Sequence, residues 1–178
     1  MYWNMINQNN FMYKFLSVDH HEYISKELYR YIVEKTDILD KQLFWNSVNV
    51  DKILEFIPLL QEYLIKEKLI AKSMSVICTP AKTQGYIHID AIPDVRILWP
   101  VKNCKGSTTK FFDIDESYVK LDYLENGVSY MNITHPGPYP QIGEFELTGP
   151  VLFNPSIGHG IYTNTSIDEP RISFTIKI

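Results

Sequence analysis

The sequence is poor in cysteine and arginine and contains no long apolar run. Its two cysteines, Cys78 and Cys104, are too few for a disulfide framework and lack the spacing of a zinc site, so we expect a reducing, cytoplasmic compartment. No apolar run reaches the roughly eighteen residues of a membrane span, and the start, MYWNMINQNN, lacks a basic segment followed by an apolar one. We therefore expect a soluble protein that is not exported and has no membrane partner.

The charge balance disfavours nucleic acid as a partner. The net charge is −4, only three residues are arginine, and the lysines are spread along the chain. Binding to a phosphate backbone usually requires a basic patch. The composition therefore favours a small molecule or a protein side chain as the ligand.

Length and apolar content indicate a single domain, residues 1–178. With 45% hydrophobic residues the chain can bury one sizeable core, and it is too short for two ordinary domains. Two patterns divide it. We expect residues 1–68 to form a mainly helical support region and residues 69–178 to form a β-rich core.

The support region carries two amphipathic helical patterns. The first begins at Asp19, which we interpret as its N-cap, and ends before Thr36. Its apolar residues that share one face are Ile24, Leu28, Tyr31 and Ile32. The second runs from Asn49 to Lys68, and Pro58 within it predicts either a kink or two abutting helices. Both are expected to pack against a sheet, while residues 11–18 fit either a loose tail or an edge strand.

After residue 68 the chain consists of short β-rich runs separated by glycine, proline, asparagine and aspartate. The runs expected to form strands are LIAKSMSVIC, YIHID, VRILWPV, TTKFFDI, SYVKLDYL, EFELT, VLFN, GIYTN and RISFTIKI. Their spacing predicts an all-β sandwich or barrel, which makes the whole chain α+β. Residues 132–141, with three prolines, predict a surface loop of the kind that often borders a binding site.

Two segments carry the chemistry. QGYIHID supplies His88 and Asp90, and SIGHG, seventy residues later, supplies His159. Two histidines and one carboxylate can occupy one face of an octahedral metal and leave three positions open, as in non-haem iron(II) oxygenases. Arg171 and Ser173 follow at alternate positions of the expected last strand, where they would share a face and suit a dicarboxylic ligand.

The order His-x-Asp, distal His and then Arg-x-Ser resembles that of the 2-oxoglutarate- and iron(II)-dependent dioxygenases, over roughly residues 69–178. The resemblance implies a double-stranded β-helix, or jelly roll, for residues 69–178, to which the helical patterns of residues 1–68 add supporting helices. The implied ligands of Fe(II) are His88, Asp90 and His159. The implied 2-oxoglutarate-binding residues are Arg171 and Ser173, with Asn103 and Arg96 as further candidates. Dioxygen and 2-oxoglutarate would be consumed while an unidentified prime substrate, a small molecule or a protein side chain, is hydroxylated.

Each of these residues also has a purely structural interpretation. Arg171 could be a surface ion-pair partner, Asp90 could form a turn, and Asn103 could begin the turn NCKG. The aromatic residues expected in the core are Trp99, Phe111 and Phe112. At the level of function, the alternatives are a jelly-roll module that binds without turnover and a cupin-type enzyme, which would usually carry a His-x-His pair and a glutamate.

Overall fold

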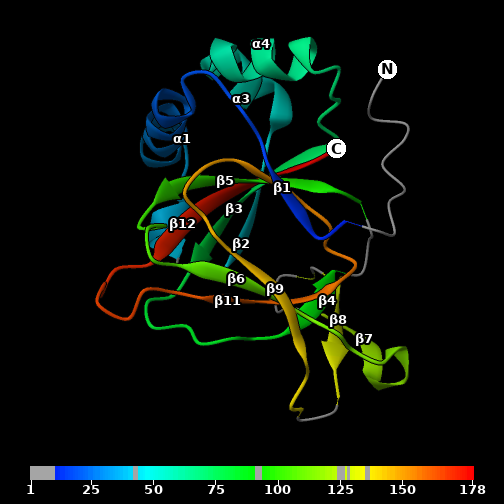
Figure 1. The fold of residues 1–178 in the computed structure, drawn as a ribbon. Helices are drawn as coiled ribbons and strands as arrows, with labels where there is room; N and C mark the ends of the chain where they lie inside the picture. Colours follow the sequence, from blue (N-terminus) through cyan, green and yellow to red (C-terminus); the bar gives the residue numbers. More distant parts are fainter. Residues whose placement is uncertain (1–10, 42–43, 91–93, 124–126, 128, 135–136) are drawn as a thin grey trace.

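Two antiparallel sheets of six strands each dominate this protein, for which a computed structural model describes residues 11–41, 44–90, 94–123, 127, 129–134 and 137–178. The helices gather on one side of the pair of sheets (Figure 1). The expected α+β class is confirmed, and the sheets form a β-sandwich-like arrangement. No helix among the described residues is long and apolar enough to cross a membrane.

The strand order defines the two sheets. Sheet A runs β1 (Tyr13–Phe15), β10 (Val151–Phe153), β5 (Arg96–Lys102), β12 (Arg171–Lys177), β3 (Ser73–Thr79) and β2 (Trp45–Val48). Sheet B runs β7 (Val119–Tyr123), β8 (Ser129–Ile133), β4 (His88–Asp90), β11 (Gly158–Tyr162), β6 (Thr108–Phe112) and β9 (Gln141–Glu146). The chain alternates between the sheets from β3 to β6 and again from β9 to β12.

Alternation along the strands of sheet A separates two cores. On β12, Ile172, Phe174 and Ile176 pack with the helices, as does Trp99 of β5. Residues of the opposite parity, such as Leu98 of β5, pack with sheet B. Because side chains alternate between the faces of a strand, the remaining residues of β12 point into the space between the sheets.

The helices cover the outer face of sheet A (Figure 1). Their bounds are α1 His21–Lys35, α2 Ile38–Lys41, α3 Val50–Phe56 and α4 Pro58–Lys66, and a short 3₁₀ turn spans Glu116–Tyr118. The four apolar residues predicted to share a face of α1 are all buried. Trp99 and Phe111 are fully buried and Phe112 nearly so, which confirms all three as core residues.

The ends of the helices agree with the sequence in part. The Asn49 side chain caps α3 by accepting a 2.9 Å hydrogen bond from the backbone N–H of Lys52. Pro58 is the first residue of α4, so the second helical pattern is two abutting helices. The prediction of Asp19 as N-cap was wrong: the capping position is His20, in a left-handed conformation with φ 59° and no side-chain cap.

Each of the nine predicted runs overlaps a strand of the structure. Three further strands, β1, β2 and β8, lie outside those runs. β1 settles the question left open for residues 11–18, since it pairs with β10 as an edge strand. β2 falls between the two helical patterns and pairs with β3, so the support region also contributes both edges of sheet A. β8 occupies the start of the predicted loop 132–141 and the residues before it. Residues 135 and 136 of that loop lie outside the described part of the chain.

Candidate metal centre

Sheet B brings His88, Asp90 and His159 together. β4 and β11 are neighbouring strands, and His159 is the direct cross-strand partner of His88. One potential ligand atom from each of the three side chains lies within 4.8 Å of the other two. The His88 Nε2 and Asp90 Oδ1 atoms are 3.5 Å apart. Two residues of β4 and one of β11, seventy positions away in the chain, thus form one cluster on the inner face of the sheet.

Backbone contacts orient both imidazoles. The Nδ1 of His88 lies 3.2 Å from the carbonyl of Tyr86, and the Nδ1 of His159 lies 2.9 Å from the carbonyl of Ile157. A carbonyl oxygen can only accept, so each Nδ1 donates to it, and Nε2 is the ring nitrogen left for the cluster. Metal-binding histidines are commonly held in this way by a hydrogen bond from the other ring nitrogen.

Electrostatics favour the protonation states that bind a cation. Burial opposes ionisation of Asp90, but its contact with His88 and the charge of Arg96 outweigh this effect and lower the Asp90 pKa to about 2. Burial, reinforced by His88, lowers the pKa of His159 to about 4. At neutral pH the buried His159 is therefore neutral and Asp90 is ionised, as a metal requires.

Arg96 lies beside the cluster and contacts Asp90. Its Nε is 2.8 Å from Asp90 Oδ2, an ion pair that is not aligned as a hydrogen bond. The guanidinium carbon lies 5.2 Å from the centroid of the Trp45 ring. The structure thus places Arg96 in the site, where its guanidinium forms an ion pair with Asp90, a candidate metal ligand.

Arg171 and Ser173 are buried polar residues, and the Cys104 thiol is the one neighbour among the described residues that offsets the charge of Arg171. Arg171 is 1% exposed and Ser173 is fully buried, and neither the three guanidinium nitrogens nor the Ser173 hydroxyl has a hydrogen-bond partner among the described residues. Burial lowers the pKa of Arg171, and the neighbouring Cys104 partly opposes that shift. The Cys104 thiol itself donates to the carbonyl of Ile172 at 3.2 Å. The interpretation of Arg171 as a surface ion-pair partner was therefore wrong.

Unpartnered hydroxyls extend this polar region toward the histidines. Buried hydroxyls without a hydrogen-bond partner among the described residues are also present on Thr79, Thr109 and Thr175. Thr109 and Thr175 line a recess that also receives His159. Thr79 is the direct cross-strand partner of Arg171 and lines a larger cavity that reaches His88.

Asn103 is not brought into the site. It has a left-handed conformation, φ 55°, in the turn after β5. Its amide donates to Glu169 Oε2 at 3.1 Å and to the carbonyl of Pro170 at 3.0 Å. Asn103 therefore fastens the loop that precedes Arg171, in keeping with the turn interpretation of this residue.

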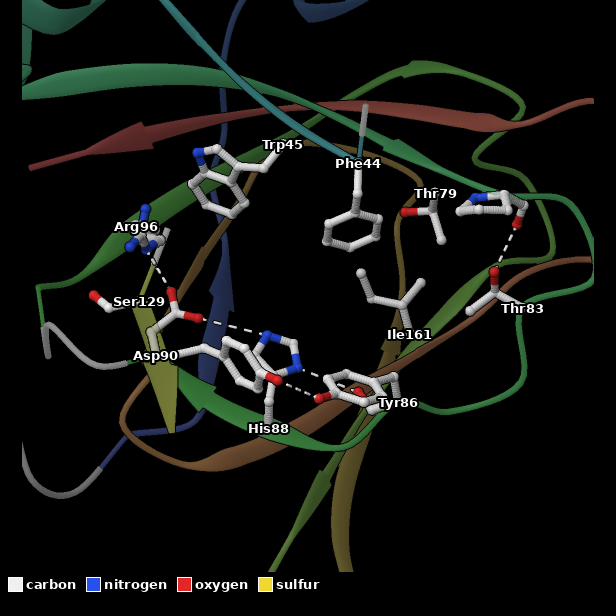
Figure 2. Close-up of a pocket in the computed structure, with 12 residues that line it drawn as sticks. Phe44, Trp45, Thr79, Thr83, Tyr86, His88, Asp90, Arg96, Ser129 and Ile161 are labelled. Atoms are coloured by element: carbon white, nitrogen blue, oxygen red, sulfur yellow. Dashed lines mark hydrogen bonds and ion pairs between the residues drawn. The ribbon is translucent and has the colours of Figure 1, made fainter. Parts of the chain in front are cut away.

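The larger cavity has a volume of about 450 Å³. Figure 2 shows Phe44 and Trp45 across the cavity from His88 and Ile161, with Asp90 and Arg96 to one side. Sequence reasoning missed the residues contributed by two unpredicted strands and their approaches, which are Phe44, Trp45, Ser129 and Tyr130. The available signal was the adjacent aromatic pair, Phe44 and Trp45, in the stretch between the two helical patterns.

No protein-family model matches this chain, and no curated protein matches it. Its function is therefore inferred from the chemistry of the site.

Proposed function

We propose that this protein is an iron(II)- and 2-oxoglutarate-dependent dioxygenase that hydroxylates a small molecule or a protein side chain. The observation that carries the proposal is the fully buried, unpartnered guanidinium of Arg171 between the sheets that also hold the cluster of His88, Asp90 and His159. A buried charge is costly unless an opposite charge pairs with it. A dicarboxylate that also binds the metal would supply that charge.

The strand order supports a jelly-roll assignment. The proposed core takes four adjacent strands from each sheet. Sheet A contributes its four central strands, β10, β5, β12 and β3, and sheet B contributes β4, β11, β6 and the edge strand β9. Along the chain these eight strands cross repeatedly between the two sheets, as the paired Greek keys of a jelly roll do. On this proposal β1, β2, β7 and β8 are additions to an eight-stranded core.

The donor set fits iron(II). His88 and His159 would each offer Nε2, and Asp90 would offer Oδ1, which gives the two-histidine, one-carboxylate set that leaves positions open for other ligands. Iron(II) bound there would supply the oxidising chemistry, in which substrate C–H, 2-oxoglutarate and dioxygen become C–OH, succinate and carbon dioxide. Arg96 would hold Asp90 Oδ2 and leave Oδ1 for the metal.

The residues of β12 and β3 would bind the cosubstrate. Arg171 offers a rigid fork of N–H donors that matches a carboxylate, and Ser173 offers a hydroxyl on the same strand face. Thr79, opposite Arg171, adds a second unpartnered hydroxyl. Because these groups lie away from bulk water, a carboxylate bound among them would be held more tightly than at the surface.

Calorimetry of 2-oxoglutarate binding tests the proposal. With an inert divalent ion in place of iron, Arg171→Lys should weaken 2-oxoglutarate binding, because lysine keeps the charge but loses the planar fork of N–H donors. Arg171→Met, which removes one partner of the buried charge pair, should weaken it by about 30-fold to several thousand-fold. Ser173→Ala should weaken it by about 2- to 12-fold, the worth of one neutral hydrogen bond. Metal affinity without 2-oxoglutarate should hardly change in any of these variants.

Arg30→Lys is the matched control, since Arg30 lies on the surface of α1 in an ion pair with Glu27. It should bind 2-oxoglutarate as the parent does. Equal 2-oxoglutarate affinities for the parent and Arg171→Lys, or no binding by the parent, would instead favour a module without turnover. An Asp90→Ala variant that binds the metal as tightly as the parent would refute the ligand assignment.

A further inference from the structure

We infer that the cavity beside the metal cluster takes an uncharged, largely apolar group that carries a hydrogen-bond donor. As a statement about the prime substrate this rests on the proposed function, whereas the cavity's ligand preference can be tested without iron or 2-oxoglutarate. Three properties of the cavity support it: its walls, its balance of charge and the direction of the hydrogen bonds at its mouth.

The walls are apolar and aromatic. Phe44 and Trp45 form one side, and Ile161 faces them from β11 (Figure 2). At about 450 Å³ the cavity falls within the range of small-molecule sites. A flat or branched apolar group placed there would lie next to His88, and so within reach of the proposed metal.

The cavity offers no free charge. Among the lining residues that the structure describes, the ionic groups are Asp90 and Arg96, which pair with each other, together with the imidazole of His88. A charged ligand would lose hydration without gaining an opposite charge in return. This balance favours a neutral ligand.

Two tyrosines that line the cavity, Tyr86 and Tyr130, belong to a chain of hydrogen bonds that runs in one direction. Tyr86, whose residue surface is 54% exposed, donates its hydroxyl proton to the Tyr130 oxygen at 2.8 Å. Tyr130 in turn donates to Asp122 Oδ2 at 3.1 Å.

This direction leaves Tyr86 as an acceptor. Its only hydroxyl proton is committed to Tyr130, and its oxygen accepts no hydrogen bond from the described residues. A phenol oxygen retains lone pairs for an incoming N–H or O–H. The polar end of the ligand is therefore a donor, and its apolar body occupies the space between Trp45 and Ile161.

Ligand-observed NMR and calorimetry with the full chain, without added iron or 2-oxoglutarate, test this with three probes that share one ring. The probes are para-cresol, para-methylanisole and para-methylbenzylamine: a neutral donor, its methylated form without the donor, and a cation. We expect para-cresol to bind tightest, with para-methylanisole about 2- to 12-fold weaker for the loss of one hydrogen bond. Tighter binding of the amine than of para-cresol would overturn the preference for a neutral group.

Three variants test whether the probes bind in this cavity. Tyr86→Phe should remove the difference between para-cresol and para-methylanisole, and Ile161→Phe should weaken both by filling the space. The control is Tyr123→Phe, which removes the same hydroxyl from a 60% exposed tyrosine of β7 that does not line the cavity. If Tyr86→Phe and Tyr123→Phe affect para-cresol equally, the donor site is not at Tyr86 and the inference fails.

A blocked glycyl-tyrosyl-glycine tripeptide separates the two sources of such a group. Binding tenfold tighter than para-cresol would assign the cavity to a peptide side chain, and weaker binding would assign it to a free small molecule. These outcomes are distinct from failure of the proposed function, because Arg171 and 2-oxoglutarate play no part in them. Probe binding with no 2-oxoglutarate binding would keep the ligand class and reject the dioxygenase.

Discussion

At the scale of single residues, Arg171, which is fully buried, and Arg96, which is mostly buried, are in opposite situations. Arg171 has no hydrogen-bond partner among the described residues, while Arg96 is paired with Asp90. Removing an unpaired charge should relieve a cost, whereas removing one half of a pair should create one. The same substitution to methionine should therefore change stability in opposite directions at the two positions.

Arg171→Met should stabilise the ligand-free protein against urea by about 1–3 kcal/mol, the penalty of a buried polar group left without a partner. The same variant should lose 2-oxoglutarate binding. A residue retained at a cost in stability is typical of a functional site. Destabilisation by Arg171→Met would show instead that the guanidinium has a structural role.

Arg96→Met should destabilise the ligand-free protein by up to about 3–5 kcal/mol, because it leaves the Asp90 carboxylate buried and unpaired. A divalent metal should recover part of this loss, since it supplies a positive charge to the same carboxylate. The thermal shift on adding Zn(II) should thus be larger for Arg96→Met than for the parent. An unchanged or smaller shift would argue against Asp90 as a ligand.

The sequence predicted that His88, Asp90 and His159 belong together, because their order, with Arg171 and Ser173 after them, resembles the motif of a known family. It could not predict the contact of Arg96. Arg96 belongs to sheet A and Asp90 to sheet B, so their pairing depends on how the two sheets face each other. Asn103 shows the opposite error: it was expected near the site, but its amide binds Glu169 and Pro170, a contact that the local sequence does not reveal.

At the scale of elements, Gly85 connects the loop after β3 to the strand that carries the ligands. Its φ is +68°, and a Cβ at this position would lie 2.3 Å from the Tyr162 hydroxyl oxygen. Gly85→Ala should therefore cost more than the roughly 1 kcal/mol expected from backbone strain alone, and it should displace Tyr86 or Tyr162. Urea unfolding measures the loss in stability.

Gly127 is the matched control for this substitution. Its φ is +81°, but a Cβ there would meet nothing within 4 Å. Gly127→Ala should therefore lose only the stability that backbone strain costs, because the added methyl group meets no neighbour. Equal losses in the two variants would mean that the contact with Tyr162 is relieved at no cost.

Elements with strong local signals were predictable, as Pro58 shows by dividing α3 from α4. β2 and β8 were not, because each is four or five residues long and mixes polar with apolar side chains. Such strands are fixed by their partners: β2 pairs with β3, and β8 pairs with both β4 and β7. The aromatic residues that β2, β8 and their approaches contribute to the cavity, Phe44, Trp45 and Tyr130, were not predicted for the same reason.

At the scale of the whole molecule, the helices and sheet A share one core. Ile24 and Leu28 of α1 and Leu60 of α4 are fully buried, in the same cluster as Phe174 of β12. Removing residues 1–68 would uncover this face and delete both edge strands of sheet A. We expect the fragment 69–178 to aggregate, because a large exposed apolar face is an aggregation site. A soluble fragment with a cooperative unfolding transition would refute this.

β4 is three residues long and meets β11 at one residue pair, His88 with His159. Among the described residues, the two candidate histidines thus form the one register pair of these named strands, and the bridge between Gln84 and Tyr162 continues the same seam. An ion bound by both imidazoles would link β4 to β11 and stabilise their pairing, which few backbone hydrogen bonds support because β4 is short. Occupancy of the site and pairing of β4 with β11 would then be coupled, and loss of the ion would loosen the strand that supplies two of its ligands.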